Sequence, residues 1–320
     1  MADGRVTLGV DLNGVRFPTP VLGASGCFGS GQELAEMIDI RRVGGIITKS
    51  VTLKPVKGLP TPRMTETPSG MLNAIGLQNP GVEGFVEKDG PWIEQAGVPV
   101  IVSIAGKSVN EYQRVAARVE GLRGVVAIEA NISCPNVERR NLVFACDPKS
   151  AGEVIGAVAR VSTVPVFAKL TPDVTDIAEV ARACVKNGAH GLSLINTLLG
   201  LAIDVETFRP ALGAVTGGLS GPAIRPVAVR AVFQVARALP DVPIIGMGGI
   251  RSGRDAAEFL LAGAWAVAVG TANFFNPHVT IEVAQSLGEI LASKGMRSPA
   301  DLRGRMVTEE PVEELAARGG

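Results

Sequence analysis

Residues 125–136 read Val-Val-Ala-Ile-Glu-Ala-Asn-Ile-Ser-Cys-Pro-Asn, an apolar run that passes directly into a polar turn. The run at 125–128 predicts a buried strand, and Cys134 stands just beyond it between two asparagines. Asparagine offers two donors and an acceptor, which suits the polar edge of a planar ligand. Pro135 stiffens the turn and favours an extended backbone at the cysteine. Because a thiol held in this way can transfer a proton or attack an electrophile, the segment predicts a strand that ends in a reactive site.

Similar apolar runs recur along the chain, with amphipathic helical patterns between most of them. Their Val, Ile and Ala content, without strict alternation, is typical of parallel strands that are buried on both faces. The eight runs cover residues 20–24, 45–48, 99–104, 125–130, 164–168, 191–195, 242–246 and 264–269. Helices are predicted over residues 110–120, 150–161, 176–187, 226–239, 253–262 and 279–294. Gly188 and Gly263 follow two of these helices, as C-terminal cap glycines do.

Eight strands alternating with helices predict an α/β protein, a (β/α)8 TIM barrel. A doubly wound sheet is the alternative, and a G-x-G-x-x-G motif after the first strand would favour it, but the chain has none there. Residues 6–17 alternate around Asn13-Gly14, which predicts an N-terminal β-hairpin. Residues 55–91 are rich in Pro, Gly and Thr and predict a lid or an inserted subdomain at the C-terminal face of the barrel.

The whole chain, residues 1–320, is predicted to form a single barrel domain, with the hairpin in 1–18 and a C-terminal tail in 306–320. The Glu-rich end of that tail, 308–320, predicts a short helix. Hydrophobic residues make up 46% of the chain, but no run approaches the roughly 18 apolar residues of a membrane span. The first residues lack the apolar core of a signal peptide, so we expect a soluble cytoplasmic protein without membrane attachment.

Charge and cysteine usage exclude several other classes. Lys plus Arg and Asp plus Glu both total 31, so nothing in the net charge indicates a nucleic-acid partner. The four cysteines have no C-x-x-C spacing and there are only two histidines, so neither a zinc site nor any other metal site is predicted. His190 is expected at the bottom of the barrel and His278 at the start of a helix, and Cys27, Cys146 and Cys184 are expected to be structural.

Barrel enzymes place their chemistry at the carboxyl ends of the strands. In this chain every predicted strand ends in small or polar residues suited to a ligand. In chain order these are Ser25; Lys49 and Ser50; Ser103; Asn131 and Cys134; Lys169; Asn196 and Thr197; Gly248 and Gly249; Gly270 and Thr271. The eight ends together predict one ligand site.

The last two strand ends indicate a phosphate. Gly248-Gly249 and Gly270-Thr271 bring bare backbone N–H groups to helix starts, where barrels bind phosphate, and residues 217–221 add a further Gly-rich turn. A phosphate-bearing ligand is therefore predicted, either the substrate or a cofactor such as FMN. Lys49 and Lys169 follow apolar strands and should prefer an anionic partner, so the site suits a flat, anionic, amide-rich ligand.

With these residues the chain resembles the class 1 dihydroorotate dehydrogenases. The matching segments occur in the family's order and span roughly residues 6–305. They are Thr48-Lys-Ser50, Asn73-Ala-Ile-Gly-Leu-Gln-Asn-Pro80, Asn131-Ile-Ser-Cys-Pro-Asn136, Ala168-Lys-Leu170, Ile195-Asn-Thr197, Gly217-Gly-Leu-Ser-Gly-Pro222, Gly248-Gly249 and Gly270-Thr271.

The resemblance implies an FMN-bound barrel that oxidises (S)-dihydroorotate to orotate in pyrimidine (UMP) biosynthesis. By similarity, Cys134 is the base that removes the C5 proton, the N5 atom of FMN takes the C6 hydride, and Lys169 lies near flavin N1 and O2. The substrate contacts implied are Lys49, Asn73, Ala74, Ile75, Gly76, Leu77, Asn131, Asn196 and Thr197. The FMN contacts implied are Ser25, Lys49, Ser50, Ser103, Asn131, Lys169, Ile195, Gly221, Gly248, Gly249, Gly270 and Thr271.

Residues 196–224 look like the 1B subclass, in which a partner subunit with FAD and an iron–sulfur cluster passes electrons to NAD. That likeness implies a homodimer within a heterotetramer, with FAD and the cluster on the partner only, because this chain lacks the four clustered cysteines of such a cluster. A homodimeric 1A-like enzyme that reduces fumarate is the alternative. Residues 137–147 depart from the family, which is more often Gly-rich in the loop that covers the base.

The residues by themselves leave three other functions open. A dihydrouridine synthase also uses an FMN barrel and a cysteine, but the zero net charge and the lack of an RNA-binding appendage argue against it. A reductase like dihydropyrimidine dehydrogenase would use the same barrel motifs. A non-catalytic flavin carrier would leave the cysteine and both lysines unexplained, and replacing Cys134 with Ala would cost it nothing.

Overall fold

The computed structural model describes residues 6–133, 135–136 and 142–307, and within them the chain closes into a parallel β-barrel. Each strand pairs with the next along the chain, and the last pairs with the first. The barrel strands are β3 (Val21–Gly23), β4 (Ile46–Ile47), β7 (Val100–Ile104), β8 (Val125–Asn131), β11 (Val166–Leu170), β12 (Gly191–Leu194), β17 (Ile244–Met247) and β18 (Ala266–Val269). They lie within or across all eight apolar runs, so the predicted (β/α)8 barrel is confirmed.

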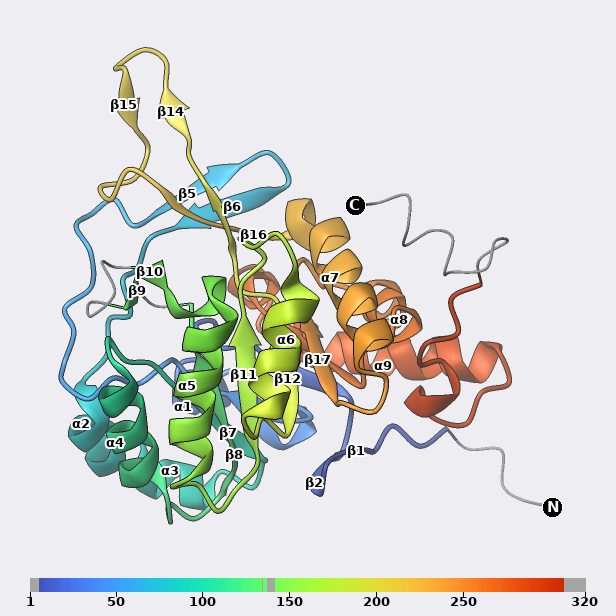
Figure 1. The fold of residues 1–320 in the computed structure, drawn as a ribbon. Coiled ribbons are helices and arrows are strands. Elements are labelled where there is room, and N and C mark those ends of the chain that lie inside the picture. The colour runs from blue at the N-terminus through green and yellow to red at the C-terminus, as the bar shows by residue number, and fades with distance from the viewer. Residues whose placement is uncertain (1–5, 134, 137–141, 308–320) are drawn as a thin grey trace.

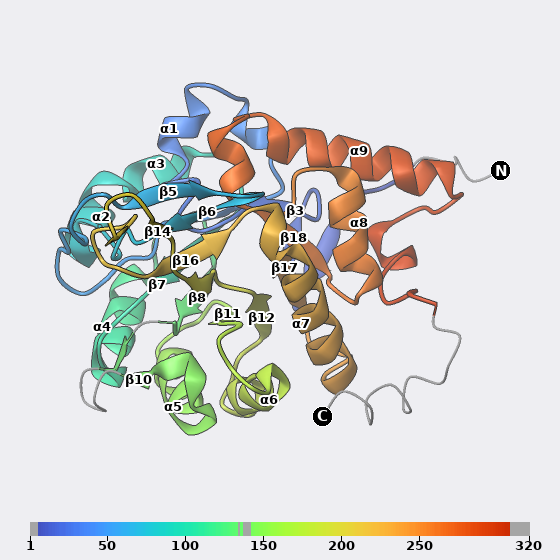
Figure 2. The ribbon, with the colours of Figure 1, turned by 90° about the horizontal axis from the view of Figure 1, so that it is seen from above.

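Helices surround the barrel, as Figures 1 and 2 show. They are α1 (Gln32–Ala35), α2 (Gly81–Lys88), α3 (Gly90–Gln95), α4 (Val109–Val119), α5 (Pro148–Ala159), α6 (Ile177–Lys186), α7 (Arg225–Ala238), α8 (Gly253–Leu261) and α9 (Val279–Ser293). The side chains of Ser108, Asp176 and Ser252 accept hydrogen bonds from the first turns of α4, α6 and α8, which satisfies backbone donors there. Gly188 and Gly263 have φ angles of 104° and 115°, which confirms them as cap glycines.

The barrel strands are buried on both faces because two apolar layers cover them. Side chains that point inward, such as Ile101, Phe167 and Ala268, form the barrel interior. Their neighbours along the same strands, such as Val102 and Ala168, point outward and pack under the helices. A strand covered in this way shows a continuous apolar run rather than an alternating one, which is the pattern that the sequence displays.

The predicted N-terminal hairpin is present and closes the bottom of the barrel. Its strands are β1 (Val10–Leu12) and β2 (Val15–Phe17), and the turn residues Asn13 and Gly14 have φ angles of 54° and 89°. Leu12, Val15 and Phe17 pack into the interior cluster of the barrel. The Asn13 amide donates to the carbonyl of His190, just before β12 begins, which places this histidine at the bottom as predicted.

An antiparallel sheet covers the other end. Strands β5 (Met64–Thr67) and β6 (Gly70–Asn73) join β13 (Leu198–Gly200) and β16 (Gly217–Ser220) in the order β13-β16-β6-β5. The predicted lid or subdomain at 55–91 therefore holds for its first half only. The prediction was wrong for the remainder, because α2 begins at Gly81 and supplies, with α3, the barrel helices between β4 and β7. A Gly and a Pro in these short helices weakened their pattern.

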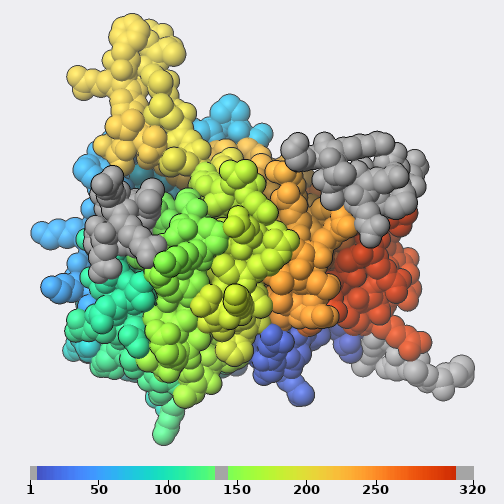
Figure 3. Space-filling view, in the orientation of Figure 1, coloured from blue at the N-terminus to red at the C-terminus, as the bar shows by residue number. Residues whose placement is uncertain are grey.

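Smaller elements complete the chain. A hairpin of β14 (Ile203–Asp204) and β15 (Arg209–Pro210) projects from the upper sheet, as Figures 1 and 3 show. Strands β9 (Pro135–Asn136) and β10 (Leu142–Val143) pair beside the barrel mouth. The helix predicted over 308–320 and residues 137–141 of the atypical loop lie outside the described residues. None of the described helices has the length and apolar character that crossing a membrane requires.

Candidate active site

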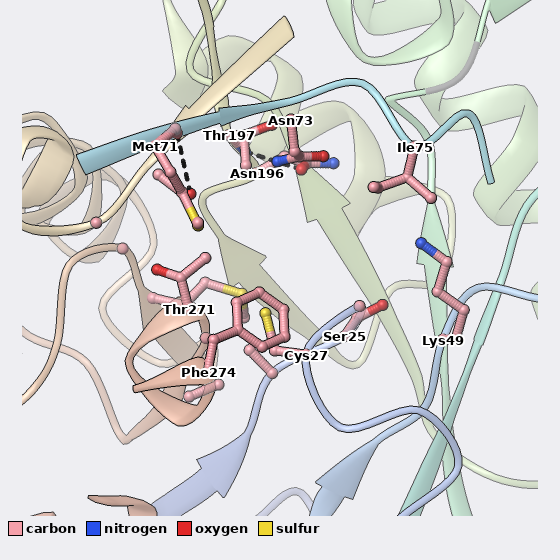
Figure 4. A pocket seen from close by; sticks show the side chains of 18 of the residues that line it. Ser25, Cys27, Lys49, Met71, Asn73, Ile75, Asn196, Thr197, Thr271 and Phe274 are labelled. Carbon is pink, nitrogen blue, oxygen red and sulfur yellow. Dashed lines mark hydrogen bonds between the residues drawn. The ribbon is translucent and has the colours of Figure 1, made fainter. Parts of the chain in front are cut away.

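A cavity of about 1470 Å³ opens at the carboxyl ends of the barrel strands, beneath the upper sheet. Almost all of the predicted site residues line it, although they come from segments spread over most of the chain. They are Ser25, Lys49, Ser50, Asn73, Ala74, Ile75, Gly76, Leu77, Asn131, Lys169, Ile195, Asn196, Thr197, Gly221, Gly248, Gly249, Gly270 and Thr271. Figure 4 shows several of these side chains around the cavity, with Lys49 reaching in from one wall and Asn73, Asn196 and Thr197 gathered on another.

Two predicted residues are placed differently. Cys134, the predicted base, lies outside the described residues. Ser103 is fully buried and stands one layer behind the cavity wall, where its hydroxyl lies 2.9 Å from that of Ser50. Direct contact of Ser103 with a cofactor therefore stays a prediction, and what the structure adds is its contact with Ser50.

The upper sheet holds the segment 73–77 over the mouth. Asn73 pairs with Gly218 across β6 and β16, and its side-chain amide donates to the Gly218 carbonyl at 3.3 Å. Further along, the backbone N–H of Leu59 donates to the carbonyl of Ile75 at 3.0 Å. These contacts come from distant parts of the chain, so the segment presents its amides and its apolar Ile75 and Leu77 as one wall of the cavity.

A hydrogen-bonded chain fixes the polar groups at the floor. Asn196 donates its amide to Asn131 Oδ1 at 3.2 Å, and Asn131 donates its own amide to Ser50 Oγ at 3.0 Å. Ser103 Oγ in turn donates to Glu129 Oε1 at 3.2 Å. Because Asn131 accepts on one side and donates on the other, its amide orientation is set by its neighbours rather than left free.

Lys169 brings positive charge to the cavity floor. Its side chain is only 7% exposed, and its ammonium lies 3.9 Å from Glu129 Oε1. Sequence reasoning missed Glu129, which sits inside the strand β8 and looks locally like part of an apolar run. The available signal was the acid itself, since a buried parallel strand rarely carries a carboxylate without a partner.

The described cysteines differ from a catalytic base. Cys27 lines the cavity, and burial raises the pKa of its thiol from 9.0 to about 11, although Lys49 and Lys169 oppose this rise. Burial also raises the pKa of Cys184 to about 12 and, less strongly, that of Cys146. All three thiols therefore stay protonated near neutral pH. The structural role expected for them stays a prediction, and Cys27 differs from the other two in lining the cavity.

The glycines at the ends of β17 and β18 form a bare backbone wall. Gly249 has a φ angle of 73°, and a Cβ atom there would stand 2.7 Å from the carbonyl oxygen of Gly221. Only glycine fits that position without strain. The helix α8 begins shortly after, at Gly253, and a short 3-10 helix begins at Thr271, so backbone N–H groups and helix dipoles favour an anion here.

These observations fit FMN. A cavity of about 1470 Å³ is larger than the roughly 300–1,000 Å³ of a site for one small ligand, so it can take a flavin and a small substrate together. The glycine wall suits the phosphate, Lys49 and Lys169 suit anionic groups, and the asparagine amides suit the polar edges of flat rings. Of the described residues, none form a cluster of three or more metal-ligating side chains.

The fold and the cavity define the class of protein: a barrel enzyme that holds a phosphate-bearing flat cofactor beside a small anionic ligand. The family model for dihydroorotate dehydrogenase matches residues 7–291, and the chain belongs to that family.

Curated relatives cover nearly the full length of the chain. It is 49% identical to the dihydroorotate dehydrogenase B (NAD(+)), catalytic subunit, of Geobacter sp. (strain M21). The match extends over 302 residues, which are 94% of this chain and 99% of the relative. The subunit of the same name from Bacillus pumilus (strain SAFR-032) is 49% identical over 95% of this chain and 98% of its own length. That from Desulforudis audaxviator (strain MP104C) is 51% identical over 94% of this chain and 97% of its own length.

Proposed function

We propose that this protein oxidises (S)-dihydroorotate to orotate in de novo pyrimidine biosynthesis, as the catalytic subunit of an NAD-linked dihydroorotate dehydrogenase. Membership of the family supports the reaction, and the names of the relatives support the NAD-linked type. The observation that carries the proposal is the meeting of three asparagine amides, two lysines and a glycine wall in one cavity.

The substrate is held by amides and lysine. Dihydroorotate is a flat-edged anion with imide groups, which match the donors and acceptors of Asn73, Asn131 and Asn196. Lys49 and Thr197 supply a cation and a hydroxyl for the carboxylate, and the backbone from Ala74 to Leu77 closes over the ring. Because the upper sheet lies over this face, we infer that it limits the access of water and so strengthens the polar contacts beneath it.

Cys134 takes the proton from C5 of the substrate. In the sequence it directly follows Ser133, and both Asn131 and Ser133 line the cavity, which supports this role. FMN, when bound, supplies the acceptor for the C6 hydride. The residues that would hold it are Ser25, Lys49, Ser50, Ser103, Asn131, Lys169, Ile195, Gly221, Gly248, Gly249, Gly270 and Thr271. Among them the glycine wall would suit the phosphate, and Lys169 would stabilise negative charge on the reduced ring.

The chain works with a second subunit. FAD and an iron–sulfur cluster on that subunit carry electrons onward to NAD, and two catalytic subunits form a homodimer within a heterotetramer. The described cysteines support this division, because Cys27, Cys146 and Cys184 come from separate elements and are free thiols. The assembly acts in the cytoplasm, and this chain contributes one barrel domain to it.

An anaerobic visible spectrum of the purified chain, taken before and after addition of dihydroorotate, tests the proposal. We expect a flavin spectrum that bleaches, with orotate formed in equal amount to the flavin reduced. A flavin that stays oxidised would overturn the substrate while leaving the cofactor, and reduced pyrimidines without the carboxylate would be tried next. Co-purification with a flavin- and iron-containing chain tests the partner.

A further inference from the structure

Glu129 is a buried acid that the proposed chemistry does not use. It is 1% exposed, and it points into the barrel because its neighbour two residues before, Ala127, belongs to the interior cluster. Ser103 pairs with it on β7, and Lys169 extends from β11 on its other side. Glu129 thus lies in a polar layer between the apolar interior of the barrel and the cavity floor.

A contribution to the stability of the fold does not explain well why this carboxylate is buried. One oxygen accepts from Ser103 Oγ and lies 3.9 Å from the Lys169 ammonium, while the other, Oε2, is buried without a hydrogen-bond partner among the described residues. A buried ion pair with an unsatisfied oxygen is often no more stable than apolar residues of the same size. An acid retained in that state needs another reason.

The contacts of Glu129 lead to two groups in the cavity. Glu129 contacts the first of them, the Lys169 ammonium at the cavity floor, directly. It is connected to the second, the side-chain amide of Asn131, by hydrogen bonds through Ser103 and Ser50. The charged side chains that line the cavity, within the described residues, are Lys49, Lys107, Lys169, Arg251 and Glu282. The cavity is therefore cationic, and Glu129 is the acid that stands directly behind one of its buried cations.

On the basis of the function proposed above, we propose that Glu129 is a positioning residue that acts through Lys169. Its carboxylate holds the Lys169 ammonium at the floor and partly neutralises it, so the positive charge presented to the flavin ring is reduced. Because positive charge near the ring favours the reduced, anionic flavin, Glu129 lowers the reduction potential of bound FMN. The same carboxylate ends the hydrogen-bonded chain that orients Asn131.

The reduction potential of FMN in the holoenzyme, measured against a reference dye, tests this role. In Glu129→Gln the side chain keeps its size and an acceptor for Ser103 but loses its charge, so we expect a shift to a more positive potential. Glu83→Gln is the matched control, because Glu83 is an exposed acid that pairs with Arg118 on the surface, and we expect no shift there. An unshifted potential in Glu129→Gln would overturn the proposal.

A double variant separates positioning from a direct effect of charge. If Glu129 acts through Lys169, the shift caused by Glu129→Gln disappears once Lys169 is also Gln, whereas an equal shift in both backgrounds would contradict this route. The double variant leaves no unpaired buried charge, so its comparison with Lys169→Gln remains available if the single Glu129 variant does not fold. The titration needs no dihydroorotate, so an error in the substrate assignment and an error in the role of Glu129 give different results.

Discussion

The two ends of the barrel are built from the same strands but differ in chemistry. At the bottom, the hairpin of β1 and β2 inserts Leu12, Val15 and Phe17 into the interior, and the closure is apolar. At the top, the same strands end in amides, lysines and glycines around an open cavity. One short hairpin closes the bottom, whereas the sheet over the top combines strands from two segments far apart in the chain.

This difference separates stability from function along one axis. Apolar burial at the bottom contributes free energy in proportion to the area removed from water. At the top, the burial of Lys169 and Glu129 is a cost that a ligand site explains better than folding does. Gly249 stands at a left-handed backbone position because only glycine adopts that conformation without strain. We therefore expect changes at the bottom to alter unfolding and changes at the top to alter binding and rate.

The largest expected effect is at the top. Cys134→Ala removes the proposed base, so the rate of flavin reduction by dihydroorotate should fall by about 10²–10⁴-fold, measured by anaerobic stopped-flow. The melting temperature and the bound flavin should stay close to those of the wild type. Cys146→Ala, at an exposed cysteine, is the control and should reduce flavin at the normal rate. A Cys134 variant that also reduces flavin normally would assign the proton to another group.

At the bottom, Phe17→Ala should act on stability alone. Phe17 is 2% exposed and fills the interior above the hairpin, so its loss should lower the free energy of unfolding by about 3–5 kcal/mol. Urea unfolding checks the stability, and flavin reduction per folded molecule should be unchanged. If the reduction rate fell along with stability, the two ends would not be independent.

Two glycines give a matched pair across the ends. Gly249 and Gly14 have φ angles of 73° and 89°, so alanine strains the backbone at both. At Gly14 a Cβ atom meets nothing within 4 Å, whereas at Gly249 it meets the Gly221 carbonyl at 2.7 Å. We expect Gly249→Ala to weaken FMN binding by at least about tenfold, equivalent to about 1.4 kcal/mol. Gly14→Ala should lower stability without changing the FMN dissociation constant, and equal loss of FMN in both would refute the distinction.

The smallest expected effect is a pH dependence of stability that arises from Cys184, a residue that belongs to neither end of the barrel. Cys184 is fully buried in α6, and its pKa is raised from 9.0 to about 12. Because the folded thiol has the higher pKa, the unfolded state loses its proton first, and stability falls as the pH rises from about 9 to about 12. At about pH 10 the loss attributable to this thiol should be about 1 kcal/mol. The Cys184→Ala variant should lack this loss of stability, which urea unfolding at pH 8 and 10 would measure. An equal loss in the wild type and in the variant would disprove the assignment.

The barrel could be predicted because its signals are local. Each of its strands is an apolar run of Val, Ile and Ala, and each glycine cap follows its own helix. The upper sheet could not be predicted in the same way, since β6 and β16 are short, carry Gly and polar residues, and pair only because the barrel brings distant segments together.

The candidate site shows the same division. Strand ends pointed to Lys49, Asn131, Lys169 and the glycine pairs, and the cavity lining includes them. Ser103 ends a strand by the same rule but stands behind the wall, because β7 extends to Ile104 and turns that side chain toward Glu129.

The sequence by itself determined where the eight barrel strands lie and which polar residues stand near their ends, because these depend on neighbours along the chain. The tertiary structure alone decided that Glu129 lies 3.9 Å from Lys169, that segment 73–77 covers the mouth, and that the hairpin seals the bottom. The physical reason is closure: distances between side chains on different strands are set by the register and curvature of the whole barrel, which no local pattern encodes.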